Sequence, residues 1–485
     1  MSTTTAAPTP APVRFHYAWV IAGVTFLVLL ATAGVRSIPP VLMVPLEQEF
    51  DWSRATISLA VSINLLLFGL LGPFAASLVL RVGMRRMMVL ALSMLTVSVA
   101  LTTLMREPWQ LWLLWGGLVG IGSGAMAGWV SASVATRWFV KRRGIVVGAL
   151  TAAGATGQLI FLPMLATVVE TIGWRAAVGI VAVSIAFVVP IVGLLMRNSP
   201  AAHGILPYGA TSEVAIPQET PALPGNPFRA AIDTLALSAK DRNFRLLAMS
   251  FFICGATTNG LIGTHLIPMS YDRGLAEVTA ASLLALIGVF DIIGTMGSGW
   301  LSDRFDNRRL LFWYYSLRGL SLLFLPFAFQ AGLPGIAIFV VFYGLDWVAT
   351  VPPTVRLTAD LFGVQRVGMV FAWMLASHQL GAAIAAYTAG AIRSSLGDYR
   401  VAFLGAGLLG LIAGILVLQV DHSDRADEGP PRRVTPSSAF SRHAWVAWLG
   451  GTSAAVSLAI LLLTITQPVQ VAASAQEFLV WCGIR

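Results

Sequence analysis

The stretch that decides the fold is RAAVGIVAVSIAFVVPIVGLLMR, residues 175–197, in which no charge stands between the two terminal arginines. A bilayer core of about 30 Å needs about 20 apolar residues per helix. Lipid offers no partner to an open backbone, so this run predicts a membrane-spanning helix. Runs of this kind recur at about 17–45, 55–79, 87–105, 110–135, 145–168 and 175–196, then at about 244–270, 278–301, 310–330, 335–355, 367–391 and 400–420.

The composition excludes an ordinary water-soluble protein. Of the 485 residues, 57% are hydrophobic and 11% are charged, whereas soluble domains carry about 25% charged residues. The ten-residue alternation of outer-membrane barrel strands is absent, so we expect helices. The predicted fold class is an all-α membrane protein.

Several functional classes lack their sequence signals. The formal charge is +9, but no Lys/Arg block stands on a polar domain, so we expect no nucleic-acid partner. No phosphate-binding loop of the GxxxxGK[ST] or GxGxxG kind occurs, and no Cys/His cluster suggests a metal site. Asp303 lies near Ser302 without the histidine that a hydrolase needs. We expect no catalytic residue, no cofactor and no metal.

The apolar runs form two sets of six, which define the predicted domains. Residues 1–13 form a disordered tail without the cationic start of a signal peptide, and 14–196 form a first six-helix bundle. The proline-rich stretch 197–243 is a linker, and residues 228–245 resemble a helix on a membrane surface. A second six-helix bundle covers 244–420. A polar linker, 421–443, precedes a thirteenth candidate membrane helix at 444–466 and a tail at 467–485.

The distribution of Lys and Arg predicts the orientation, because cytoplasmic loops carry an excess of both. The loops within 81–86, 137–143, 197–245, 304–309 and 356–366 hold seventeen of them, and the loops on the other side hold six. We therefore expect the N-terminus and the linker in the cytoplasm and the chain in the plasma (inner) membrane.

The two sets of helices resemble copies of each other. A shift of 221 residues places Gln158 on Gln379. A shift of 223 places Arg36 on Asn259, Pro45 on Pro268, Arg81 on Arg304, Arg85 on Arg308 and Arg86 on Arg309. Arginine pairs alone could reflect the charge bias of cytoplasmic loops, but the proline and glutamine pairs favour duplication. Two repeated bundles with a binding site between them are typical of a transporter.

The loop GWLSDR (299–304), which includes Gly299, Asp303 and Arg304 and is followed by Arg308 and Arg309, resembles the loop motif of the major facilitator superfamily. The resemblance implies a gating role for this loop and for its first-half copy. That copy keeps Arg81, Arg85 and Arg86, but has Ala76 and Leu80 where the motif has glycine and aspartate.

Two further stretches, PLEQEFDWSR (45–54) and RWFVKRRG (137–144), resemble the monocarboxylate porter and oxalate–formate antiporter group of that superfamily. The resemblance covers about 14–420, apart from the central linker. It implies the major facilitator fold, two six-helix bundles related by an internal repeat.

Arg36 is a candidate substrate-binding residue. It precedes Glu47 by eleven residues, about 16 Å along a helix, so it lies well inside the span. Pro39 and Pro40 remove backbone donors beside it, and a guanidinium can hold a carboxylate through two parallel hydrogen bonds. The resemblance adds that monocarboxylate porters carry a substrate-binding cation in this helix. The alternatives are snorkelling or a salt bridge to another helix.

Asp291 is a candidate proton-coupling residue. Thr295, Ser298 and Ser302 follow it on one helix face and predict a polar stripe. A carboxyl group withdrawn from water favours its protonated form, which a nearby cation can reverse. Monocarboxylate porters place a proton-linked aspartate in this helix with an arginine one turn later, where this chain has Thr295. The alternative is a fixed, hydrogen-bonding aspartate.

Weaker candidates occupy the remaining helices. Asp346 is a second proton-coupling candidate that either lines a cavity or pairs with Arg318, whose better interpretation is a structural ion pair. Polar neutral residues in helices 5, 7, 10 and 11 complete the predicted substrate site, although each alone is more often a helix–helix hydrogen bond. They are Gln158, Asn259, Tyr343, His378 and Gln379.

The sequence therefore predicts a secondary transporter of small organic anions, with monocarboxylates as the expected class. Its expected partners are the small anionic substrate, protons and the lipid bilayer, and we expect a monomer. One alternative is a drug or metabolite exporter of the same fold. Another is a membrane sensor that keeps the fold without transport. The sequence leaves open the substrate, the direction of transport and the role of residues 421–485.

Overall fold

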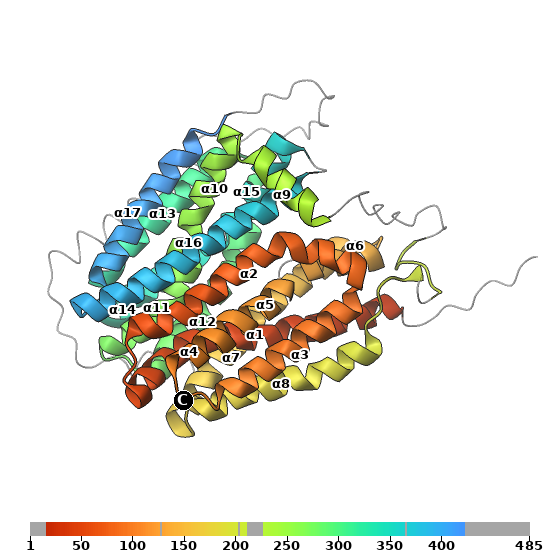
Figure 1. Ribbon diagram of the computed structural model, residues 1–485. Coiled ribbons are helices and arrows are strands. Elements are labelled where there is room, and N and C mark those ends of the chain that lie inside the picture. Colours follow the sequence, from red (N-terminus) through yellow and green to blue (C-terminus); the bar gives the residue numbers. More distant parts are fainter. Residues whose placement is uncertain (1–15, 127–128, 202–203, 211–226, 364–365, 422–485) are drawn as a thin grey trace, which may run out of the picture.

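The computed structural model describes residues 16–126, 129–201, 204–210, 227–363 and 366–421 (Figure 1). Within these ranges, 11 helices are long and apolar enough to cross a membrane. The fourth predicted span, 110–135, is divided into shorter helices and so is not among them. The thirteenth candidate span, 444–466, lies outside the described residues.

The first half of the molecule contains the six predicted spans in order. Its fourth span consists of four successive pieces, of which η1 is a π-helix, and residues 127–128 between the last two are not described. The helices are α1 (Tyr17–Phe50), α2 (Arg54–Val82), α3 (Met84–Thr102), α4 (Pro108–Leu111), η1 (Trp112–Val119), α5 (Gly120–Met126), α6 (Trp129–Trp138), α7 (Arg143–Thr171) and α8 (Trp174–Leu195).

The second half also has six spans, and α9 (Pro227–Ser238) precedes them in the region between the halves. Its first span contains a π-helix, η4, and its fourth is broken between two helices. The helices are α10 (Arg242–Gly255), η4 (Ala256–Ile262), α11 (Gly263–Asp272), α12 (Glu277–Ser302), α13 (Asn307–Ala328), α14 (Gly332–Asp346), α15 (Val351–Phe362), α16 (Val367–Leu396) and α17 (Arg400–Leu418).

Local sequence explains where several helices begin, bend or continue. Ser53 caps α2, because its side chain accepts a hydrogen bond from the Thr56 N–H. Gly83 separates α2 from α3 with a φ of 86°, a conformation that favours glycine. Pro39, Pro40 and Pro45 lie inside α1, which continues as one helix through all three.

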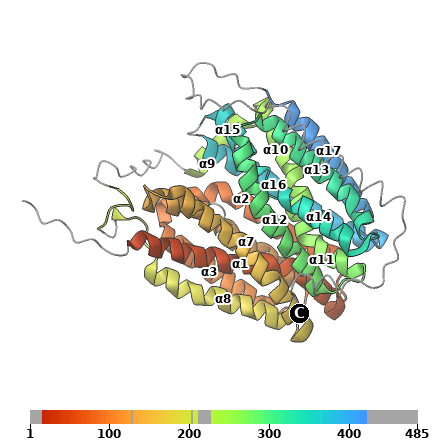
Figure 2. The same cartoon turned by 180° about the vertical axis from the view of Figure 1, so that it is seen from behind.

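The two halves form two bundles that pack along three pairs of helices (Figure 1). α2 lies against α16, α7 against α12, and α1 against α11, and Figure 2 shows α7 beside α12 from behind. The 223-residue shift carries α2 onto α12, and the 221-residue shift carries α7 onto the span of α16. The pair of α2 with α16 and the pair of α12 with α7 are therefore equivalent, as a duplicated chain predicts.

Large apolar side chains cover the outside of the bundles. Leu90, Val183, Phe187 and Met296 are among the most exposed, with Met296 72% exposed. Soluble proteins rarely display apolar surface on this scale, whereas lipid provides it with an apolar environment. The exposed surface thus agrees with a membrane protein.

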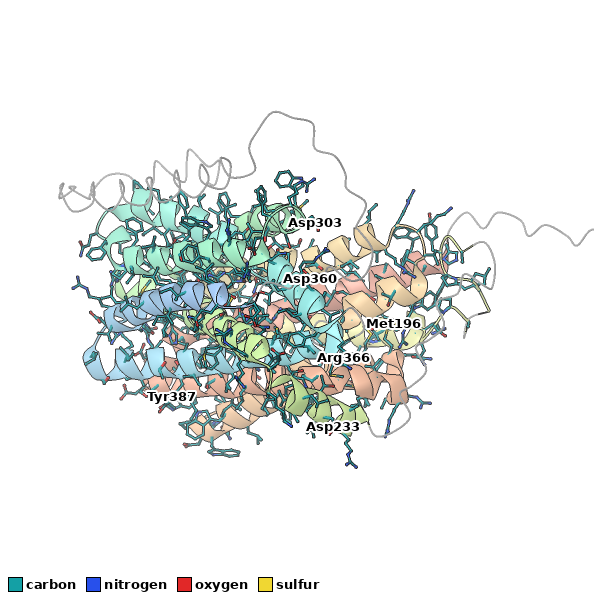
Figure 3. The ribbon with its side chains drawn as sticks, turned by 90° about the horizontal axis from the view of Figure 1, so that it is seen from above. Met196, Asp233, Asp303, Asp360, Arg366 and Tyr387 are labelled. Carbon is teal, nitrogen blue, oxygen red and sulfur yellow. The ribbon has the colours of Figure 1, made fainter. Side chains whose placement is uncertain are left out.

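The two ends of the molecule differ in the elements that they carry. α9, α15 and α6 lie towards one end in Figure 1, which we call the α9 end. The loops that follow α1, α11 and α16 lie at the opposite end, which we call the Arg54 end. Figure 3 shows Tyr387 of α16 far from Asp233 of α9 and from Asp303, which follows α12.

Candidate functional site

A cavity of about 40 Å³ lies where the two halves meet. Arg36 of α1 and Gln158 of α7 line it from the first half, and Asp291 of α12 and Trp347 line it from the second. A cation, an amide and a carboxyl group thus face one space, which has room for water or a small polar group. The sequence had singled out all three polar residues.

Arg36 has no carboxylate partner among the described residues. Its side chain is exposed, lines the cavity and places its guanidinium carbon 5.3 Å from the centre of the Phe68 ring. A charge at this depth in a membrane is costly unless something compensates it. The geometry therefore leaves the guanidinium free to bind an anion.

Asp291 is held by two hydrogen bonds at the other side of the cavity. Its Oδ1 atom accepts one from the backbone N–H of Val348 at 2.9 Å and one from the Thr295 hydroxyl at 3.0 Å. The predicted polar stripe is present, but Ser298 and Ser302 donate to Ala349 and Asn307 rather than facing the cavity.

The bond from Val348 places Asp291 at a break in the tenth span. α14 ends at Asp346 and α15 begins at Val351, next to Pro352, which lacks a backbone N–H. Side chains satisfy the backbone groups that the break exposes: Asp291 accepts from Val348, Ser298 donates to Ala349, and Arg318 donates to the carbonyl groups of Asp346 and Trp347. Asp291 therefore joins the cavity to this break.

Arg318 and Asp346 form a buried ion pair, the second of the two arrangements that the sequence allowed for Asp346. Arg318 Nε donates to Asp346 Oδ2 at 2.6 Å, and its Nη1 donates to the Cys254 sulfur at 2.8 Å. Arg318 is 1% exposed and Asp346 6% exposed. Asp346 does not line the cavity, and its role in proton coupling stays a prediction.

The other predicted substrate residues do not line this cavity. Tyr343 is buried and donates to the Thr257 carbonyl at 2.6 Å, and Asn259 belongs to η4. The His378 ring packs against Phe251, with ring centres 4.8 Å apart. Gln379 packs against Gly69 of α2, across the boundary between the halves. The contacts of Tyr343, His378 and Gln379 are those of helix packing. Substrate binding by these residues and by Asn259 stays a prediction.

The two copies of the loop motif have different surroundings. In the second half, Arg308 pairs with Asp306 at 3.0 Å, Arg309 lies 4.0 Å from the same carboxylate, and Arg304 stacks on the Trp300 ring at 4.2 Å. Asp303 is exposed, and Gly299 has open space around it. In the first half, Arg81, Arg85 and Arg86 line a separate pocket.

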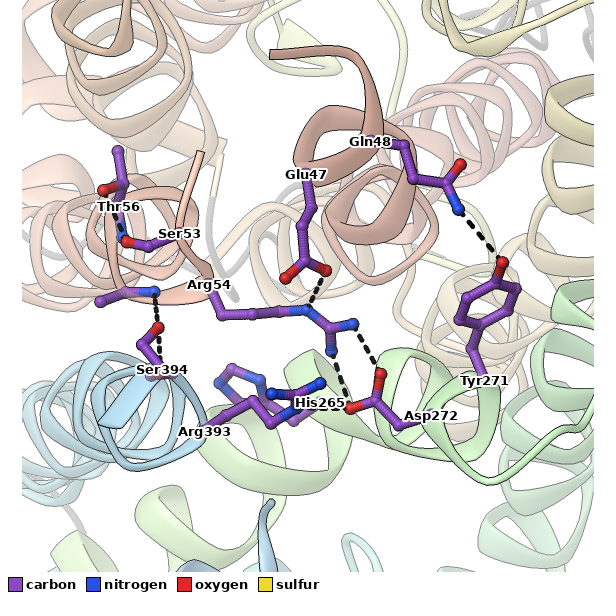
Figure 4. Close-up of polar contacts among 12 residues, drawn as sticks. Glu47, Gln48, Ser53, Arg54, Thr56, His265, Tyr271, Asp272, Arg393 and Ser394 are labelled. Carbon is purple, nitrogen blue, oxygen red and sulfur yellow. Dashed lines mark hydrogen bonds and ion pairs between the residues drawn. The ribbon is translucent and has the colours of Figure 1, made fainter. Parts of the chain in front are cut away.

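Arg54 is a residue whose role the sequence did not reveal. Its side chain is 2% exposed, and its guanidinium contacts Glu47 at 2.6 Å and Asp272 at 2.9 Å (Figure 4). It also donates to the Tyr399 hydroxyl at 3.0 Å. Arg393 also donates to Asp272, at 2.7 Å. Burial raises the pKa of Tyr399 to about 12, so its hydroxyl stays neutral. These contacts tie α2 of the first half to α11 and to the loop between α16 and α17 of the second half at the Arg54 end.

Comparisons with known proteins agree with this fold. The sequence pattern of the Major Facilitator Superfamily matches residues 24–357 and 247–478. The chain therefore belongs to this superfamily of membrane transporters, as the loop motif suggested.

Named transporters are similar to this chain over most of its length. The chain is 25% identical to "Monocarboxylate transporter 12" of Xenopus laevis over 446 residues, which cover 88% of this chain and 94% of that protein. It is 26% identical to "Monocarboxylate transporter 11" of Homo sapiens, over 84% of this chain and 83% of that protein. It is also 24% identical to the "Uncharacterized MFS-type transporter YcxA" of Bacillus subtilis, over 77% of this chain and 87% of that protein.

Solved structures share the fold. The partially occluded, inward-open structure of the xylose transporter XylE from E. coli matches with a TM-score of 0.66 at 14% identity, over 85% of this chain and 99% of that chain. An inward-facing bacterial homologue of the human lysosomal transporter Spinster also has a TM-score of 0.66, at 15% identity, over 83% of this chain and 97% of that one.

Proposed function

We propose that this protein is a proton-linked secondary transporter of small organic anions, in particular monocarboxylates. The observation that carries the proposal is that two groups line one cavity between the halves: a guanidinium that has no carboxylate partner among the described residues, and a carboxyl group. Similarity to proteins named monocarboxylate transporters supports the substrate class.

The contacts between the halves support an alternating-access mechanism. At the Arg54 end, the ion pairs of Arg54 with Asp272 join the halves, and Gly390 of α16 lets the helix approach Ser58 of α2 closely. By the count of Lys and Arg, this end faces outwards and the α9 end faces the cytoplasm. The structure then corresponds to a state that is closed to the outside, and transport requires these contacts to open.

Arg36 binds the substrate carboxylate in this proposal. The planar guanidinium can hold both carboxylate oxygens, whereas an ammonium group is a point charge on a flexible stem. Loss of one partner from a desolvated charge pair costs about 2–5 kcal/mol, or about 30-fold or more in affinity. We therefore expect Arg36→Lys to transport poorly and Arg36→Ala to lose transport.

The test is uptake of a panel of labelled carboxylates, and of their uncharged amides, into proteoliposomes under an imposed pH gradient. Arg106→Ala, which removes an exposed arginine outside the cavity, is the matched control. Carboxylates but not amides should enter, and Arg36→Ala should abolish their entry although the protein is present in the membrane. Entry that ignores the charge of the substrate would indicate an exporter of neutral compounds, and binding without flux would indicate a sensor.

Asp291 carries the coupled proton in this proposal. The carboxylate accepts a hydrogen bond from the Val348 N–H at 2.9 Å, and protonation weakens such a charge-assisted bond. A proton on Asp291 therefore loosens the broken segment of the tenth span while it removes a negative charge from the cavity that receives the anion. Both effects, the loosened segment and the lost negative charge, link the binding of the proton to the binding of the substrate.

Asp291→Asn should separate exchange from accumulation, because asparagine imitates the protonated carboxyl group at nearly the same size. Counterflow of labelled substrate at equal pH should continue, since exchange needs no net proton movement. Uptake driven by an acidic outside should be lost. If this variant still accumulates substrate against its gradient, Asp291 is not the proton site, and Asp346→Asn becomes the next variant to compare.

A further inference from the structure

A second pocket, of about 980 Å³, lies at the α9 end of the first half, away from the cavity between the halves. Four arginines line it: Arg81, Arg85 and Arg86, around the turn between α2 and α3, and Arg137 at the end of α6. Asn198 closes one side and accepts a hydrogen bond from the Arg85 backbone N–H at 3.0 Å. We call this space the basic pocket.

The arginines of the basic pocket have no carboxylate partner among the described residues. The duplicated loop of the second half shows what is missing. There, Arg308 and Arg309 share Asp306, and Asp303 belongs to the same loop. The 223-residue shift places Asp303 on Leu80 and Asp306 on Gly83. The first-half loop has therefore kept the three arginines of the motif without either of its carboxylates.

The chemistry of the pocket favours a phosphate group as the missing anion. Guanidinium groups bind phosphate oxygens through paired, charge-assisted hydrogen bonds, and a pocket that gathers four of them suits a group carrying several acceptor oxygens. Basic pockets between membrane helices on the cytoplasmic side are known to bind lipid head groups.

The walls of the pocket indicate that the phosphate belongs to a lipid. Val79, Val89 and Leu90 continue the lining beyond the arginines. Leu90 of α3 is 63% exposed and Leu194 of α8, next to the lining residue Gly193, is 69% exposed. Apolar surface that is exposed beside a cationic pocket suits an acyl chain below a charged head group. We propose that the basic pocket binds the phosphate of an anionic phospholipid of the cytoplasmic leaflet, given the orientation proposed above.

The experiment measures the thermal stability of the purified full-length protein in detergent while one of three additives is titrated. The additives are dioleoyl phosphatidylglycerol, dioleoyl phosphatidylcholine and inorganic phosphate. The test variant is Arg81→Gln/Arg86→Gln, and its matched control is Arg304→Gln/Arg309→Gln, which removes the repeat mates of the same two arginines. Both variants lose two positive charges at the same end of the molecule.

Phosphatidylglycerol should stabilise the native protein at lower concentration than phosphatidylcholine, and inorganic phosphate should have little effect. The test variant should need at least about tenfold more phosphatidylglycerol for half of the effect, and the control should behave as the native protein. If both variants lose the stabilisation by phosphatidylglycerol equally, the lipid is attracted to positive charge in general, and specific binding in the basic pocket is overturned. An effect of inorganic phosphate that equals that of the lipid would overturn the lipid source. Arg137→Gln, from a different helix, repeats the test if the double variant does not fold.

Discussion

Arg36 and Arg318 are both arginines within apolar helices, and their surroundings differ in one respect. Arg318 is fully buried and paired with Asp346 at 2.6 Å, whereas Arg36 faces a cavity and has no carboxylate partner within the described part of the chain. A buried pair compensates its own desolvation, and removal of one member leaves an unpaired charge. Arg36 is therefore available to bind a ligand, and Arg318 is occupied by its ion pair with Asp346.

Arg318→Ala should destabilise the protein by about 3–5 kcal/mol, because Asp346 would remain as a buried charge without its partner. Arg36→Ala should change stability little, since Arg36 pairs with no carboxylate in the ranges that the structure describes. Thermal unfolding of both variants in detergent measures the difference. The double variant Arg318→Met/Asp346→Leu should recover most of the loss. An Arg318→Ala protein that unfolds like the native one would contradict a structural role for the pair.

At this scale, the sequence could predict residues whose charge conflicts with their surroundings. Arg36, Asp291, Arg318 and Asp346 were visible because each interrupts an apolar run. Arg54 was not, because a charge at the start of a span looks like an ordinary loop charge. Its partners Asp272 and Tyr399 lie more than two hundred residues away, and only the packing of the halves brings them together.

At the scale of elements, the contacts among α2, α11 and α16 hold the two halves together at the Arg54 end. Arg54 is their centre, because it contacts both Glu47 of its own half and Asp272 and Tyr399 of the other. The nearby pair of Arg175 and Glu49, at 2.6 Å, lies entirely within the first half. Loss of the Arg54–Asp272 pair removes a contact between the halves, whereas loss of the Arg175–Glu49 pair removes a contact within one half. Comparison of the two losses therefore separates the closure of this end from the local stability of the first half.

Arg54→Gln should open the Arg54 end, whereas Arg175→Gln should not. Spin labels at 107 and 395, one exposed position in each half, report the separation by double electron–electron resonance after replacement of the native cysteines. We expect longer distances, or a second longer population, in Arg54→Gln only. The same distance distribution in Arg54→Gln and in the native protein would show that other contacts hold this end closed.

Element boundaries were predicted best where a span is one regular helix. Predicted 175–196 and 400–420 correspond to α8 (Trp174–Leu195) and α17 (Arg400–Leu418). The fourth span and the tenth were predicted as single segments, and both are divided. Hydropathy does not distinguish an α-helix from a π-helix such as η1, and the break after α14 depends on side chains of α12 and α13 that satisfy its backbone.

At the scale of the whole molecule, the proposed orientation rests on the count of seventeen Lys and Arg residues on one side against six on the other. Lys141 is exposed in the turn before α7, at the predicted cytoplasmic side, and Asp398 is exposed between α16 and α17, at the other side. In intact cells, Lys141→Cys should resist a membrane-impermeant thiol reagent and Asp398→Cys should react. Strong labelling at 141 from outside would reverse the proposed orientation.

The internal repeat made the interface between the halves predictable in outline. Two aligned sets of six helices imply that equivalent helices meet in equivalent pairs, as α2 with α16 and α12 with α7 do. The cavity itself was less predictable, because its lining combines side chains of α1, α7 and α12 with Trp347 at the break in the tenth span. Its polar residues were recognised, but their common position required the packed structure.

The opposite charges in the cavity have an electrical consequence. Arg36 and Asp291 contribute one positive and one negative charge, so the empty site is neutral overall. A monovalent anion loaded together with one proton also sums to zero, so the loaded site is neutral too. The membrane voltage does work only on net charge that crosses the bilayer. In the proposed mechanism it therefore contributes nothing, and uptake at a fixed pH difference should be the same at every clamped voltage.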